Sequence, residues 1–186
     1  MKTIFATILS ISLFAFTLKT EPTKYFTREA NITFLSEAPL EKIEGINNQA
    51  VSMLDISTGQ IEFAVLMKAF EFDRALLQEH FNENYAESDK FPKSNFKGNI
   101  TNFADVKWAV DGDYSVTVTG KLTMHGVTKD VTAKGKITVK AGAISATSTF
   151  NVLMSDFNIV IPTVVKDKVN NSVKIEVISN YKPYLG

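Results

Sequence analysis

Residues 114–152 read YSVTVTGKLTMHGVTKDVTAKGKITVKAGAISATSTFNV, and this stretch decides the fold. Apolar and polar side chains alternate along it in three runs, which are separated by turn sequences at 125–128 and 141–142. A period of two is typical of a β-strand that has one face in a core and the other in water. The stretch therefore predicts three consecutive antiparallel strands joined by hairpins.

Each run is about ten residues long, which exceeds the modal strand length of about five to six residues. Long strands in a meander favour a closed barrel, because closure removes the unpaired edges of an open sheet. Shorter or less regular strands are expected at 30–34, 43–56 with a break at Asn47 and Asn48, 61–68, 96–100, 106–110 and 173–177. The sequence therefore predicts a mainly β protein, an antiparallel β-barrel of about eight strands.

Two glycines in the long strands, Gly120 and Gly135, fall at positions where an inward side chain is expected. One interpretation is a bend in the barrel, which glycine permits without steric cost. The other is that the missing side chains leave room for a ligand. The sequence leaves both interpretations open.

Between residues 73 and 85 the period of the apolar residues changes from two to that of a helix. Asp73 is an expected N-cap, and Pro92 cannot continue the helix. Five side chains recur on one side at helical spacing: Leu76, Leu77, His80, Phe81 and Tyr85. This pattern predicts one amphipathic helix that covers an end or a side of the barrel.

The first residues have the pattern of an exported protein. Lys2 is followed by an uncharged run, rich in Ile, Leu and Phe, that extends to Leu18. This indicates a signal peptide at 1–20, without a clean cleavage site, followed by one domain at 21–186. We expect a periplasmic or secreted protein with no transmembrane span in the mature chain, either a monomer or a homodimer. With no cysteine in the chain, no disulfide framework is possible.

Charge and residue content exclude several classes of function. Twenty basic residues balance twenty acidic ones, so no basic field favours nucleic acid. Of the two histidines, His80 has no second histidine four residues away, and His125 lies in a turn without a nucleophile motif. We therefore predict no catalytic residue, no metal site and no cofactor, and we expect that the protein is not an enzyme.

Four segments resemble the YceI-like family: EHFNE at 79–83, ESDKFPKSNFKG at 87–98, GKLTMHGVTK at 120–129 and SDF at 155–157. Met124 and Asp130 depart from the usual pattern, where an aliphatic residue and a proline are more common. The resemblance implies an exported, extended, lipocalin-like barrel with an apolar cavity, which in some members holds a polyisoprenoid chain.

The expected function is binding of a long apolar lipid, with a polyisoprenoid or quinone-like chain, without chemical change. Residues expected to line the cavity are Phe63, Met67, Leu77, Phe81, Phe96, Trp108, Met124 and Phe150. Lys129 is a candidate for the lipid head group, because the alternation points it inward near a barrel end; the alternative is a lysine that reaches to water. A secreted structural or stress-related interaction barrel without lipid is the second hypothesis, and a small-molecule enzyme the third.

Overall fold

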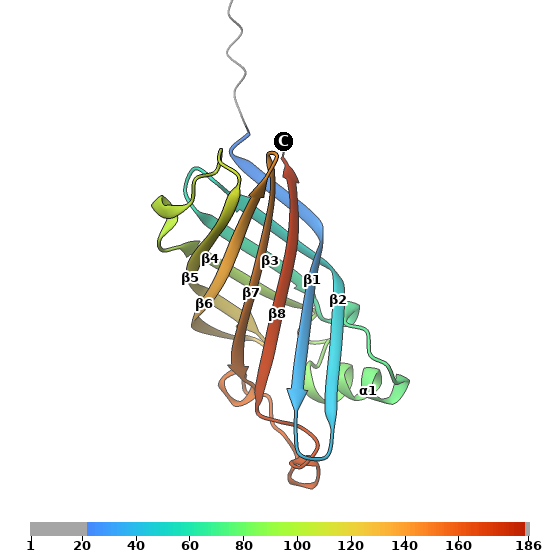
Figure 1. Ribbon diagram of the computed structural model, residues 1–186. Coiled ribbons are helices and arrows are strands. Elements are labelled where there is room, and N and C mark those ends of the chain that lie inside the picture. Colours follow the sequence, from blue (N-terminus) through green and yellow to red (C-terminus); the bar gives the residue numbers. More distant parts are fainter. Residues whose placement is uncertain (1–21, 185–186) are drawn as a thin grey trace, which may run out of the picture.

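A computed structural model describes residues 22–184, which form a closed barrel of eight antiparallel strands (Figure 1). Each strand pairs with the next, and the last pairs with the first. The strands are β1 Lys24–Glu37, β2 Lys42–Asp55, β3 Gln60–Leu66, β4 Lys93–Ile100, β5 Gly112–Met124, β6 Val127–Lys140, β7 Ala143–Leu153 and β8 Ser172–Pro183. The predicted barrel is confirmed; the predicted signal peptide lies outside the described residues.

The three long strands β5, β6 and β7 follow the alternation of the sequence. Both hairpins have two-residue turns, with φ of 51° and 74° at His125 and Gly126 and of 49° and 80° at Ala141 and Gly142. Positive φ at both positions gives a turn whose twist matches that of the strands it joins. The strands therefore keep their register, with the apolar set directed into the barrel.

β6 and β7 are paired along only part of their length. Their ladder runs from Lys140 and Ala143 to Lys134 and Thr149 and stops there. Residues 127–133 of β6 pair with β5 but not with β7. Between these residues and β7, the barrel wall therefore has no ladder of backbone hydrogen bonds.

The strand predicted at 106–110 is wrong, because residues 101–111 form a loop with a short 3₁₀ helix at Phe103–Asp105. Asn102 ties this loop to β5: its Nδ2 donates to the Ser115 carbonyl (3.0 Å), and its Oδ1 accepts from the Thr117 amide (2.9 Å). The buried Val106 belongs to the core, with Trp108 packed against it. The apolar spacing of the loop therefore reflects packing against the core and not strand pairing.

The barrel is filled with side chains at the end where the chain termini lie (Figure 1). Buried residues of this filled half include Tyr25, Leu54, Ile137, Ile144 and Tyr181. Two further apolar clusters occupy the other half, nearer the helix. The filled half supplies a conventional core, and the space for a site is left in the other half.

A buried hydroxyl pair lies inside the filled half. The Tyr181 phenol is 2.8 Å from Ser52 Oγ, which itself donates to the Glu62 carbonyl at 2.9 Å. Because the serine proton is used in that bond, the phenol donates to Ser52. Burial raises the pKa of Tyr181 to about 12.

This shift predicts a loss of stability at alkaline pH. The neutral phenol is favoured in the folded protein, so its contribution is complete below pH 10 and is lost as pH rises toward 12. We expect the free energy of unfolding to fall by about 3 kcal/mol more in the wild type than in Tyr181→Phe over this range. Urea unfolding at a series of pH values measures the difference; parallel curves for the two proteins would contradict the prediction.

Gly120 faces Gly98 across the ladder between β4 and β5. A Cβ on Gly120 would lie 2.5 Å from the Gly98 Cα and 2.7 Å from the ring of Phe96. The space left by Gly120 is therefore taken by the neighbouring strand and by an aromatic ring. Gly135, in contrast, borders the empty space described next.

Candidate functional site

The predicted helix is formed by α1, Ala75–His80, which continues into a π-helical turn at Phe81–Tyr85. Its N-cap is Arg74 and not the expected Asp73, whose carboxylate lies 3.5 Å from Arg74 Nε. The cap residue makes no capping hydrogen bond with its side chain, and no residue of α1 is fully buried. The helix is therefore held in place by the packing of neighbouring residues more than by capping hydrogen bonds at its ends.

Aromatic packing attaches this helix to the barrel. The ring of Phe81 lies 5.3 Å from Phe34 of β1 and 5.5 and 5.0 Å from Phe70 and Phe72, which precede the helix. Aromatic pairs at such distances add stability beyond the area that they bury. Four of the fourteen phenylalanines are thus used to hold the helix at one end of the barrel.

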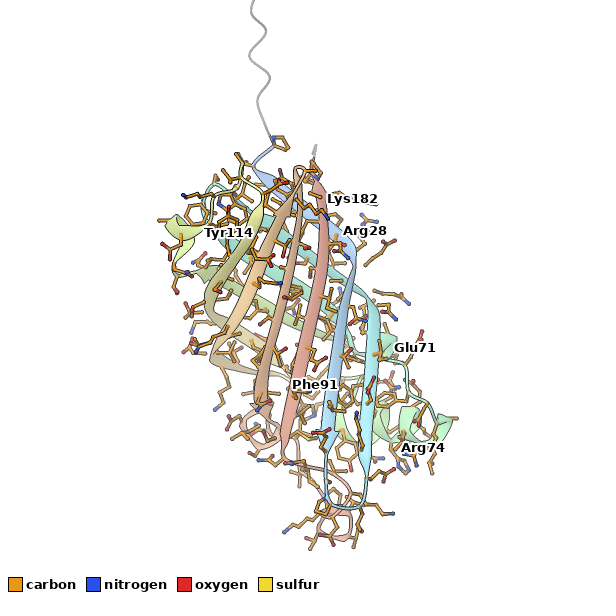
Figure 2. The ribbon with its side chains drawn as sticks, viewed as in Figure 1. Arg28, Glu71, Arg74, Phe91, Tyr114 and Lys182 are labelled. Atoms are coloured by element: carbon orange, nitrogen blue, oxygen red, sulfur yellow. The ribbon has the colours of Figure 1, made fainter. Side chains whose placement is uncertain are left out.

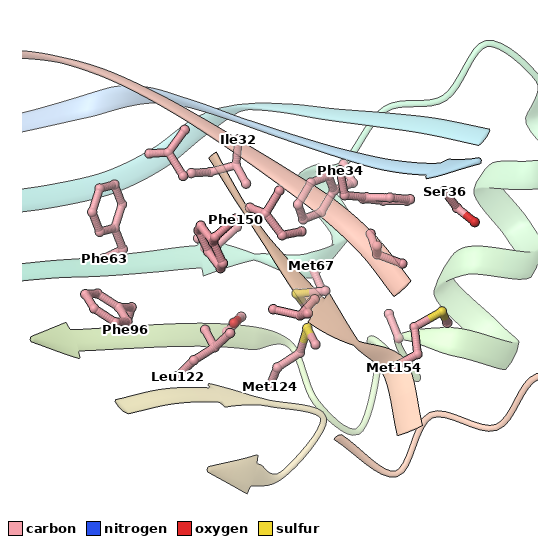
Figure 3. A pocket seen from close by; sticks show the side chains of 18 of the residues that line it. Ile32, Phe34, Ser36, Phe63, Met67, Phe96, Leu122, Met124, Phe150 and Met154 are labelled. Atoms are coloured by element: carbon pink, nitrogen blue, oxygen red, sulfur yellow. The ribbon is translucent and has the colours of Figure 1, made fainter. Parts of the chain in front are cut away.

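An apolar cavity of about 450 Å³ occupies the half of the barrel nearer the helix (Figure 3). Its walls come from all eight strands, the helix and the connection between β7 and β8. Deep in the barrel it meets the filled core at Ile61 and Val116, and toward the helix it reaches Leu76 and Val165. Its volume lies within the range of about 300–1,000 Å³ that is usual for small-molecule sites.

Seven of the eight side chains that the sequence predicts for the cavity line it. They are Phe63, Met67, Leu77, Phe81, Phe96, Met124 and Phe150. Five of them are labelled in Figure 3 and lie around a common space: Phe63, Met67, Phe96, Met124 and Phe150. Trp108 does not line the cavity. Its ring packs against the filled core, with its centroid 5.9 Å from that of Phe103. That the seven contact a ligand stays a prediction.

The head-group candidate Lys129 lies on β6 opposite Leu122, is exposed, and is not among the residues that line the cavity. Its role in binding a head group stays a prediction. Three charged groups from outside the strands border the cavity instead, and none of them was a sequence candidate: Glu41, Arg74 and Lys168. They come from turns and from the β7–β8 connection, where no periodicity indicates which way a side chain points.

His125 joins three segments near the cavity. Its Nδ1 donates to the Phe157 carbonyl at 3.0 Å, and its Nε2 lies 2.7 Å from the Glu87 carboxylate. The ring also packs on Phe91, with 4.5 Å between centroids, and its side chain is 12% exposed. The imidazole therefore connects the β5–β6 turn, the segment after the helix and the β7–β8 connection.

Replacing His125 by asparagine is expected to lower the free energy of unfolding by about 2 kcal/mol. Asparagine tolerates the positive φ of 51° at this position, so the loss reports the imidazole contacts and not backbone strain. Urea unfolding measures the change. The matched control is His80→Asn, an exposed residue at the last position of α1, which should change stability by less than about 0.5 kcal/mol. An equal loss in both would contradict the role of His125.

The YceI-like domain profile matches residues 24–179, which is more than half of the chain. The chain belongs to the YceI-like family. No match is found among curated proteins.

Two solved structures share the YceI-like barrel. A polyisoprenoid binding domain from Saccharophagus degradans, implicated in plant cell wall breakdown, has a TM-score of 0.76 at 11% identity, over 88% of this chain and 100% of that domain. BcnA from Burkholderia cenocepacia has a TM-score of 0.68 at 15% identity, over 82% of this chain and 96% of its own. At these identities the likeness shows the fold.

Among residues 22–184, no three His, Cys, Asp or Glu side chains are grouped so that they could hold a metal ion. Within the same residues, no helix is both long enough and apolar enough to cross a membrane.

Proposed function

We propose that this protein binds a long apolar lipid, with a polyisoprenoid or quinone-like chain, inside the barrel and does not alter it chemically. The observation that carries the proposal is the apolar cavity within a closed barrel. Support also comes from the Saccharophagus degradans neighbour, which is described as polyisoprenoid binding. The cavity favours this function over a barrel without a ligand.

The energetics agree with a hydrocarbon ligand. Each methylene-sized group removed from water contributes about 0.8 kcal/mol, so a chain of several isoprene units has ample driving force. Ordering the flexible chain offsets part of this gain. Because one carbon more or less changes binding by only about 1–3 kcal/mol, we expect the site to accept chains of several lengths.

Aromatic and methionine side chains suit such a chain. Met67, Met124 and Met154 all border the cavity and are labelled in Figure 3. Methionine is unbranched and adaptable, so it can fill the gaps around an irregular ligand.

The pattern of the first twenty residues supports export, and we propose a periplasmic or secreted location.

The test is to purify the protein from its native host, extract it with organic solvent and analyse the extract by mass spectrometry. A long isoprenoid-type lipid in stoichiometric amount would support the proposal. Protein that carries no lipid from its host, and that takes up no prenyl chain when mixed with one in detergent, would contradict it.

A further inference from the structure

The most exposed large apolar side chains gather at one end of the barrel. Val164, Val160, Leu40 and Leu76 are 91, 76, 71 and 61% exposed, and no other large apolar side chain in the described chain exceeds 54%. Together they are called here the mouth patch. Side chains so exposed are costly in water, and several at one place indicate an interaction surface.

The segments that carry the mouth patch are connected to one another. The Leu40 amide, in the β1–β2 turn, donates to the Asp167 carbonyl of the β7–β8 connection at 2.9 Å. Arg74, which caps α1, forms an ion pair with Glu41 of the same turn. Figure 1 shows the turn and the connection together at the helix end, and Figure 2 shows Arg74 there, far from Tyr114.

The mouth patch is continuous with the cavity. Leu76 belongs to both, and Glu41, Val165 and Ile159, each next in sequence to a patch residue, line the cavity. The apolar surface outside therefore leads directly to the apolar space inside. A ligand that enters from this end passes the four exposed side chains first.

Charges in the three segments balance. Residues 37–42, 73–76 and 159–169 contain four basic side chains, Lys42, Arg74, Lys166 and Lys168, and four acidic ones, Glu37, Glu41, Asp73 and Asp167. Such a surface does not attract one sign of charge. Its attraction for a partner must come from the aliphatic side chains.

We propose that the mouth patch docks on a lipid bilayer, inserting its aliphatic side chains so that the cavity opens toward the acyl chains. This rests on the proposed function, because a long apolar lipid is stored in a bilayer and crosses water only at high cost. Aliphatic side chains on separate loops can each enter the interfacial layer without a complementary protein surface. Because the charges of these three segments balance, docking is expected to depend little on the net charge of the bilayer.

Sedimentation with vesicles of pure phosphatidylcholine tests the docking. We expect the wild type to bind, and Leu40→Ser/Val164→Ser to bind at least about tenfold less. The matched control is Val110→Ser/Ile178→Ser, two side chains that are 54 and 48% exposed outside the mouth patch, which should bind within about twofold of the wild type. Addition of anionic lipid or salt should change binding little.

Several results would overturn the proposal: no binding by the wild type, equal loss in both double variants, or a requirement for anionic lipid.

Light scattering without vesicles tests a second copy as the partner, and a dimer abolished by Leu40→Ser/Val164→Ser would overturn docking in favour of self-association. Uptake of a prenyl chain from detergent separates lipid binding from membrane docking, because this uptake depends on the cavity alone. If Leu40→Ser/Val164→Ser takes up the prenyl chain normally but no longer sediments with vesicles, the result would support docking.

Discussion

Ala133→Trp is expected to reduce lipid affinity by about a hundredfold while the barrel stays folded. Ala133 lines the cavity from β6, and an indole there would occupy space that the proposed lipid would fill. Displacing about four methylene-sized groups of lipid costs about 3 kcal/mol, which corresponds to about two powers of ten in the dissociation constant. Titration with a fluorescent prenyl analogue measures the affinity.

The control for this variant is the adjacent residue. Thr132 is exposed on the outer face of the same strand, so Thr132→Trp adds an equal side chain outside the barrel. It should leave affinity unchanged within about twofold. Circular dichroism establishes that both variants are folded, and an unaltered affinity in a folded Ala133→Trp would place the lipid elsewhere.

Gly120→Ala is expected to lower the free energy of unfolding by about 3 kcal/mol. The new Cβ would lie 2.5 Å from both the Gly98 Cα and the Lys97 carbonyl oxygen. Because these are backbone atoms, a rotamer change cannot relieve the contact, and the β4–β5 ladder itself must shift. Urea unfolding of the two proteins measures the loss.

Gly112→Ala is the matched control on the same strand. A Cβ there would meet only the side chain of Tyr114, at 3.3 Å, and the backbone needs no positive φ. Its stability should change by less than about 0.5 kcal/mol. If both substitutions cost the same, the loss would reflect strand propensity and not the close approach of β4 to β5.

Alternation predicted the barrel well where a strand has one apolar and one polar face, as in β5, β6 and β7. It was incomplete in β1, which was expected near Ala30 but begins at Lys24. A register shift between Thr27 and Ala30 moves the buried set from odd to even positions. A single period cannot describe a strand across such a bulge.

Polar residues inside the barrel misled the prediction for β2. A break was expected at Asn47 and Asn48, yet the strand is continuous from Lys42 to Asp55. Asn47 is fully buried: its Nδ2 donates to the Leu66 carbonyl at 2.9 Å, and its Oδ1 accepts from the Gln49 amide at 2.8 Å. Sequence alone does not show that an amide in a strand has such partners.

The same limit applies to the candidate site. Inward side chains on strands, such as Phe63 and Phe150, were predicted correctly because the alternation along a strand determines which way each side chain points. Trp108 was misplaced because its loop was taken for a strand. Glu41 and Lys168 were missed because turns and irregular connections have no period, and their directions depend on long-range contacts such as that between Leu40 and Asp167.

The incomplete ladder between β6 and β7 has a consequence for the size of the ligand. Residues 127–133 of β6 are not paired with β7, so these strands can part there without breaking a ladder of backbone hydrogen bonds between them. Separation along such a seam costs far less than opening a paired ladder. The width of the barrel is thus adjustable on this side, and under the proposed function a chain larger than the resting cavity would be accommodated by widening this wall.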